Sequence, residues 1–165
     1  MSCVPRMEAG PPPPYEDIIF RRIASSRLDL KQSVIDGVVG TLVPRGLVPA
    51  EDEPWLCLCL DEAVVNAMLH GNEGDPGFDI DVVVGLDSDR WYVQIADCGT
   101  GFDLAHLPKI DSDDALAAEH GRGVRLMADW LDDLTWFRGG AVTRMGRHRC
   151  DLAPATAAAP ASESA

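Results

Sequence analysis

The stretch DEAVVNAMLHGN at residues 61–72 decides the fold. Glu62 and Asn66 are four residues apart, so on an α-helix they stack on one face with their Cβ atoms about 5–6 Å apart. His70 continues the same row, beside apolar residues that face a core. A carboxylate and an amide at such a border need partners if they are buried, and a Mg²⁺ ion and a water molecule would satisfy them. Taken alone, the stretch also fits an ordinary amphipathic helix with polar surface residues.

A second motif, DCGTGF at residues 97–102, follows an apolar segment that is typical of a strand. Gly99 and Gly101 permit a backbone shape that side chains would block, and they let the main chain approach a ligand closely. Asp97 lies at the mouth of this turn, where its carboxylate can accept a hydrogen bond from an exocyclic amine. The alternative interpretation is a glycine-rich turn with an aspartate cap.

A third motif, HGRGVRLM at residues 120–127, places Gly121 and Gly123 just before an expected helix. The unpaired N–H groups and the dipole at a helix start favour a phosphate group. The motif is not a Walker A sequence, because no Gly-Lys-Ser/Thr follows it. A single G-x-G before a helix is weak evidence by itself.

Outward from these motifs, the hydrophobic period changes several times between residues 17 and 150 and predicts strands alternating with helices. The last two strands are joined by Gly139 and Gly140, which is a hairpin signal. This order predicts an α+β fold with a mixed, mostly antiparallel sheet that helices cover on one face. The expected strands are 17–25, 78–86, 90–97, 134–138 and 141–147, and the expected helices are 28–46, 51–70 and 124–134.

Both ends of the chain are predicted to be disordered. Residues 1–16 include the proline run 11–14, which favours polyproline II at best. Residues 151–165 form a low-complexity tail with little to bury. We therefore expect one domain over residues 17–150, with no composition break that would mark a second.

Composition excludes some classes of partner. The chain has 165 residues and a formal net charge of −13, with 27 acidic against 14 basic residues. Binding a nucleic acid takes clustered Lys and Arg, so a nucleic-acid role is not expected. An acidic surface also disfavours docking to anionic lipid.

The expected location is the cytoplasm. No stretch approaches the roughly 18 apolar residues of a membrane span, and no secretory signal pattern opens the chain. The five cysteines are most simply free thiols in a reducing compartment.

The three motifs together are far more specific than each alone. A helical E-x-x-x-N, a D-x-G-x-G at a strand end and a G-x-G at a helix follow one another in the layout of the GHKL ATPase superfamily. The span 17–149 resembles the stand-alone anti-sigma factor serine/threonine kinases of bacterial partner-switching systems. The resemblance rests on EAVVNAMLHGN, DCGTGFD, GRGVRLMADWLDDL and the closing AVTRMGRHR. It implies a Bergerat-type ATP-binding α/β sandwich.

The resemblance also implies residue roles around the phosphates. Glu62 matches the family's general base, and Asn66 matches the ligand of the Mg²⁺ that bridges the phosphates of ATP. Gly121 and Gly123 would lie against the phosphates. A cation near the γ-phosphate would help, and Arg122 is one candidate; Lys109, in the acidic stretch where the family has its ATP lid, is the other.

At the other end of the nucleotide, the resemblance assigns Asp97 to the adenine amino group, on a floor shaped by Gly99 and Gly101. The implied reaction transfers the γ-phosphoryl group of ATP to a serine or threonine of a small antagonist protein with a STAS fold. A sigma factor and a second copy of the chain are further partners that the resemblance leaves open.

Other functions compete with this one. The second hypothesis is a binding module that holds ATP as a switch for protein binding and transfers no phosphate; the intact Glu62 favours the enzyme, because a pure binder needs no base. The catalytic fragment of a sensor histidine kinase would need a phosphoacceptor histidine upstream, and no histidine precedes residue 61. A metal or redox protein has only scattered Cys and His residues in its support.

Overall fold

A single mixed sheet carries the fold. The structure, a computed structural model, describes residues 2–102 and 119–149, without the side chains of residues 119–122. Six strands form the sheet in the order β1-β5-β6-β4-β3-β2, with the β1–β5 pair parallel and every other pair antiparallel. The strands are β1 (Arg6–Met7), β2 (Asp17–Ser25), β3 (Asp79–Leu86), β4 (Arg90–Ala96), β5 (Asp133–Phe137) and β6 (Val142–His148).

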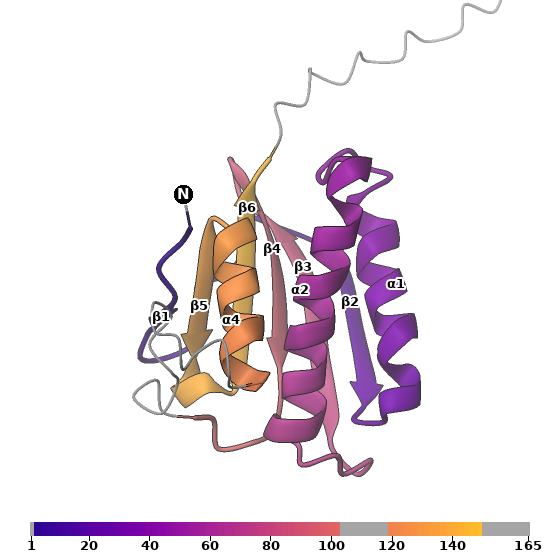
Figure 1. Cartoon of the computed structure of the whole chain (residues 1–165), viewed down its shortest axis with the longest axis vertical. Helices are drawn as coiled ribbons and strands as arrows, with labels where there is room; N and C mark the ends of the chain where they lie inside the picture. Colours follow the sequence, from indigo (N-terminus) through magenta and orange to yellow (C-terminus); the bar gives the residue numbers. More distant parts are fainter. Residues whose placement is uncertain (1, 103–118, 150–165) are drawn as a thin grey trace, which may run out of the picture.

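Helices cover one face of this sheet. Within the described ranges the α-helices are α1 (Lys31–Leu42), α2 (Glu53–Val65) and α4 (Glu119–Trp130), and Figure 1 shows all three in front of the strands. Short 3-10 turns lie at η1 (Leu28–Leu30), η2 (Ala50–Asp52) and η5 (Arg138–Gly140). The prediction of an α+β sandwich with helices on one face is confirmed.

The core lies between the helices and the central strands. Val82 and Val84 of β3 face Ile95 and Val93 of β4, and all four side chains are buried. The residues between them on β4 are only partly buried, so the strand alternates as a sheet with one covered face should. This alternation is the signal from which these strands were predicted.

The central helix changes its geometry at the first site motif. Directly after α2, residues Asn66–Gly71 form a π-helix, η3, rather than a further α-helical turn. The Asn66 N–H bonds to the carbonyls of Glu62 and Ala63, and the Asn72 N–H reaches back five residues to Ala67 at 2.9 Å. Such π-turns inside helices are frequent at functional sites.

The N-terminal segment is not the disordered tail that was predicted for residues 1–16. Arg6 and Met7 pair with Thr135 and Trp136 of β5, and the Cys3 N–H donates to the Ala128 carbonyl at 2.8 Å. A strand this short has no periodicity of its own, so the pattern of the segment did not reveal it. Its pairing comes from the exposed edge that β5 offers.

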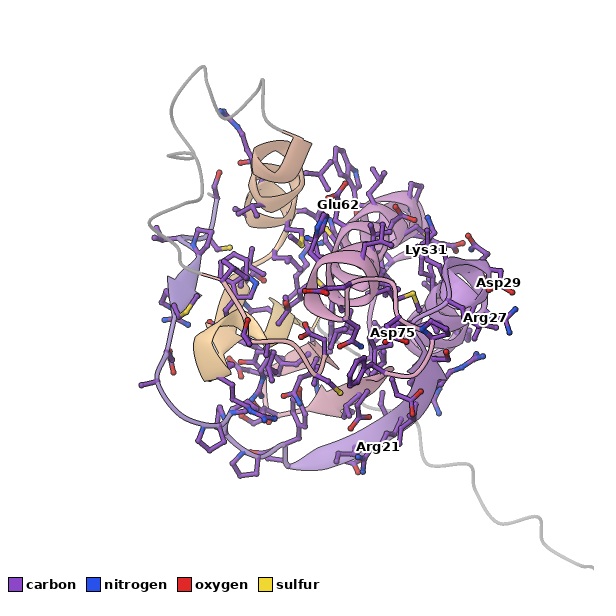
Figure 2. All side chains as sticks on the ribbon, turned by 90° about the horizontal axis from the view of Figure 1, so that it is seen from below. Arg21, Arg27, Asp29, Lys31, Glu62 and Asp75 are labelled. Carbon is purple, nitrogen blue, oxygen red and sulfur yellow. The ribbon has the colours of Figure 1, made fainter. Side chains whose placement is uncertain are left out.

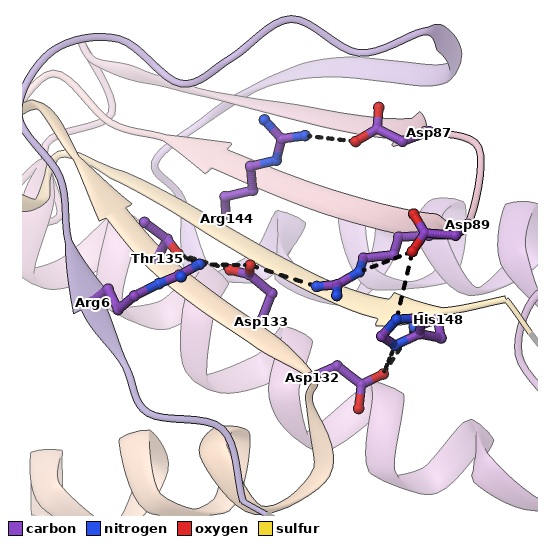
Figure 3. Close-up of polar contacts among 9 residues, drawn as sticks. Arg6, Asp87, Asp89, Asp132, Asp133, Thr135, Arg144 and His148 are labelled. Carbon is purple, nitrogen blue, oxygen red and sulfur yellow. Dashed lines mark hydrogen bonds and ion pairs between the residues drawn. The ribbon is translucent and has the colours of Figure 1, made fainter.

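The same segment is clamped to the uncovered face of the sheet by Arg144. The Arg144 guanidinium packs against the rings of both Tyr15 and Tyr92, 4.2 and 4.0 Å from their centroids, and donates to the Pro13 carbonyl at 2.7 Å. It also pairs with Asp87 at 3.7 Å (Figure 3). Since Arg144 is only 3% exposed, these contacts are made out of water.

Replacing Arg144 with glutamine is expected to lower the free energy of unfolding by about 2–4 kcal/mol, because it removes a desolvated cation–π pair and a charged hydrogen bond. Urea unfolding measures this. The matched control is Arg21→Gln, whose ion pair with Asp81 is on the surface and screened by solvent, so its loss should lower the free energy of unfolding far less. Equal losses in both variants would contradict the clamp.

Helix α4 begins earlier and ends earlier than predicted. It starts at Glu119, so Gly121 and Gly123 lie inside the helix and not before it. It ends at Trp130, and Leu134 belongs to β5. Glycines usually mark helix ends, which is why the boundary was misplaced; here packing against α2 outweighs their low propensity. Residues 103–118, with Lys109, and the predicted tail at 151–165 lie outside the described residues.

Candidate functional site

The three motifs meet along one continuous helical segment, α2 with η3. Near its middle, Glu62 reaches α4, where a Cβ on Gly123 would overlap the Glu62 carboxylate. At its C-terminal end, a Cβ on Gly71 would overlap the carboxylate of Asp97, and one on Gly99 would overlap the Gly71 carbonyl. The fold therefore brings together motifs that are far apart in the sequence.

The Glu62 carboxylate lies between two helices. Glu62 is partly buried on α2, and Figure 2 labels it on the side of α2 toward α4. Gly123 is buried in the second turn of α4, and its missing side chain leaves the space that the carboxylate occupies. The structure thus corrects the predicted position of Gly123, which lies inside α4, where it admits Glu62, and not just before the helix. Its contact with the phosphates stays a prediction.

The start of α4 still offers backbone donors. Gly121 lies in the first turn of the helix, where N–H groups have no intrahelical acceptor. Such a turn favours an anion. Arg122 is in the same turn, and its side chain is outside the described part of the structure.

Asn66 is one turn beyond Glu62 and is partly buried at the start of η3. In the described ranges, no group of three or more His, Cys, Asp or Glu side chains could hold a metal ion. An amide oxygen is nevertheless a suitable ligand for Mg²⁺, which is commonly held by one or two protein groups and completed by phosphates and water. Asn66 therefore fits a metal that arrives with the nucleotide.

Asp97 directly follows β4, and one of its two carboxylate oxygens has a hydrogen-bond partner. The Asp97 N–H donates to the carbonyl of Ala141, just before β6, at 2.9 Å, and its Oδ1 accepts the Gly99 N–H at 2.8 Å. Within the described residues, Oδ2 accepts no hydrogen bond. Burial raises the pKa of this carboxyl, while the Gly99 N–H and the charge of Arg138 act to lower it. A half-buried acceptor with one vacant oxygen suits the amino group of an adenine.

The turn after Asp97 needs its glycines. Gly101 has a φ of +82°, in the left-handed region that favours glycine, and a Cβ there would overlap the Gly139 carbonyl. The Phe102 N–H donates to that same carbonyl at 2.8 Å. The loop after β4 is therefore packed backbone to backbone against the β5–β6 hairpin. The close approach to a ligand that the D-x-G-x-G motif predicts stays a prediction.

A residue that the sequence analysis missed holds this loop in place. Asn72 is 3% exposed; its amide donates to Ser26 Oγ at 2.8 Å and to the Asp79 carbonyl at 3.0 Å. Its Oδ1 accepts the Cys98 N–H at 2.8 Å. Asn72 thus ties the end of η3 to the residue next to Asp97. An Asn after a Gly is an ordinary helix stop, so the pattern gave no sign of this role.

Replacing Asn72 with alanine is expected to cost about 2–4 kcal/mol of stability, because buried hydrogen-bonding groups lose their partners. ATP should also bind more weakly, since the loop beside Asp97 is released. Urea unfolding and ATP titration measure the two effects. The control is Gln32→Ala, which removes a surface hydrogen bond to Asp36 and should change neither quantity. Normal ATP affinity in a destabilised Asn72→Ala protein would contradict the positioning role.

This site and fold define a nucleotide-binding protein of the GHKL type. The model of the histidine kinase-like ATPase domain matches residues 29–147, which is more than half of the chain. The protein therefore belongs to the histidine kinase-like ATPase domain family and is an ATP-binding member of that class. The search of curated proteins found no match.

Across residues 2–102 and 119–149, no helix is both long and apolar enough to cross a membrane.

Proposed function

We propose that the protein is an ATP-dependent serine/threonine protein kinase that acts as an anti-sigma factor and phosphorylates a STAS-type antagonist. The main support for the proposal is the position of the Glu62 carboxylate. It lies between α2 and α4, against the glycine motif that is assigned to the phosphates. A protein that only binds ATP has no need of a carboxylate at this place.

Each residue then has a distinct role. Glu62 accepts the proton of the attacking serine or threonine hydroxyl, whose oxygen forms the new bond to the γ-phosphorus as the bond to ADP breaks. Asn66 would hold the Mg²⁺, which would neutralise charge on the phosphates. Asp97 accepts the adenine amino group, and the first turn of α4 faces the phosphates with its N–H donors.

The partners follow from the resemblance to partner-switching kinases. The acceptor would be a small STAS-fold protein with a serine or threonine. A sigma factor and a second copy of the chain are the further binding partners to test, and the cytoplasm is the proposed location. The net charge of −13 disfavours binding to a nucleic acid. This suits a regulator that acts through protein contacts.

The test is a transfer assay. The purified protein is incubated with Mg²⁺, ATP labelled at the γ-phosphate and STAS-domain proteins encoded in the same genome. Label on a serine or threonine of one of them is the expected result. Saturable ATP binding without transfer to any of them, together with ATP-dependent binding of a protein partner, would replace the kinase with an ATP-gated switch.

A further inference from the structure

The hairpin between β5 and β6 contains an arginine in a costly backbone conformation. Arg138 has a φ of +53°, and it is followed by Gly139 at +67° and Gly140 at +103°. Left-handed conformations are easy for glycine and uncommon for other residues. Such outliers tend to persist at functional sites, where the side chain has a use. A third glycine would make this turn with less strain.

The turn is fixed beside the adenine end of the site. The Phe102 N–H donates to the Gly139 carbonyl at 2.8 Å, and the Asp97 N–H donates to the Ala141 carbonyl at 2.9 Å. These bonds lock the hairpin to both ends of the loop that carries Asp97. Burial raises the pKa of the Asp97 carboxyl, and the Arg138 charge lies close enough to oppose that rise.

The side chain is available for a ligand. Arg138 is exposed, and within residues 2–102 and 119–149 its guanidinium makes no ion pair or hydrogen bond. Most arginines of this acidic chain behave differently and pair with carboxylates. Those pairs are made by Arg6, Arg21, Arg27, Arg90, Arg125, Arg144 and Arg147.

We propose that Arg138 binds the nucleotide at its base end, with the planar guanidinium against the face of the purine. This rests on ATP binding at Asp97 and adds a second contact to it. A guanidinium stacks on flat π systems, and its attraction to them grows as water is excluded. Asp97 would accept a hydrogen bond from the edge of the base, and Arg138 would stack on the face of the same base.

The test compares Arg138→Gln, which keeps the strained turn, with Arg138→Gly, which relaxes it. Both variants are expected to bind ATP about three- to thirtyfold more weakly. ADP should lose affinity by the same factor, because the contact is to the base. Arg138→Gly should unfold at the wild-type temperature or above it. The charge-matched control is Arg45→Gln, beyond the end of α1, which should not alter binding.

Several outcomes would overturn the proposal. Unchanged ATP affinity in both variants would show that Arg138 does not contact the nucleotide. A loss of affinity for ATP but not for ADP would show that Arg138 binds a phosphate and not the base. A loss of affinity seen only alongside a lower unfolding temperature would make it a structural residue. Failure of the kinase proposal is a separate result, since wild-type protein that binds ATP without transferring phosphate still supports this comparison.

Discussion

Glu62→Gln is expected to bind ATP within about twofold of the wild-type affinity and to transfer phosphate about 10²–10⁴-fold more slowly. The amide keeps the shape of the carboxylate between α2 and α4, so the helices stay packed as they are. It cannot take the proton of the attacking hydroxyl. Isothermal titration with ATP and a single-turnover transfer assay separate these two effects.

The matched control for this variant lies on the same helix. Glu53 is exposed at the start of α2, and Glu53→Gln makes the same chemical change away from α4. It should leave both binding and transfer unchanged. An unchanged rate of phosphate transfer in Glu62→Gln would refute the role of Glu62 as general base. Weaker ATP binding in this variant would show that the carboxylate already contributes to binding of ATP before the transfer step.

Asp97→Asn is expected to weaken ATP binding by about a hundredfold or more. The acceptor oxygen that is vacant in the structure becomes either a neutral carbonyl or an N–H₂ that opposes the adenine amino group. A site built to pair with a polar group discriminates strongly once that pairing is lost.

The same substitution is expected to stabilise the fold at neutral pH. Burial raises the pKa of Asp97 above the ordinary value of 3.8, so the ionised carboxylate is disfavoured in the folded state. This penalty is present above the raised pKa and disappears as the pH falls below the unfolded value. The gain in unfolding free energy of the Asn variant should therefore be seen at pH 7 and vanish in acid.

Asp75 supplies the control for the binding effect. Its Oδ1 accepts the Gly77 N–H at 2.8 Å, the same local geometry as that of Asp97 and Gly99, but it is exposed on a turn (Figure 2). Asp75→Asn should leave the ATP affinity unchanged. Wild-type ATP affinity in Asp97→Asn would refute the adenine contact.

The sequence predicted those parts of the fold whose signal is local. The alternation and apolar runs at β2, β3 and β4 gave their bounds within a residue or so. The hairpin glycines gave the pairing of β5 with β6. Strand β1 could not be predicted, because two residues have no period and their partner is distant in the sequence.

In the functional site, too, only the features with a local signal could be predicted. Spacing was enough to place Glu62 and Asn66 on one continuous helical segment, α2 with η3, and Asp97 at a strand end. Spacing could not show that Gly123 stands inside α4 to admit Glu62, because that depends on how closely two helices pack. Asn72 and Arg138 were missed because their importance lies in tertiary contacts and in a backbone angle. The roles assigned to the site residues remain predictions.

The parallel pairing of β1 with β5 is a contact of long sequence separation. Arg6 lies opposite Thr135, 129 residues further along the chain. Contacts of such long sequence separation form slowly, because a large loop must close first. The contacts of Arg144 with Tyr15 and Pro13 span a similar distance along the chain. During folding this edge of the sheet therefore pairs late, and until it does, the unpaired N–H and C=O groups of β5 can pair with another chain.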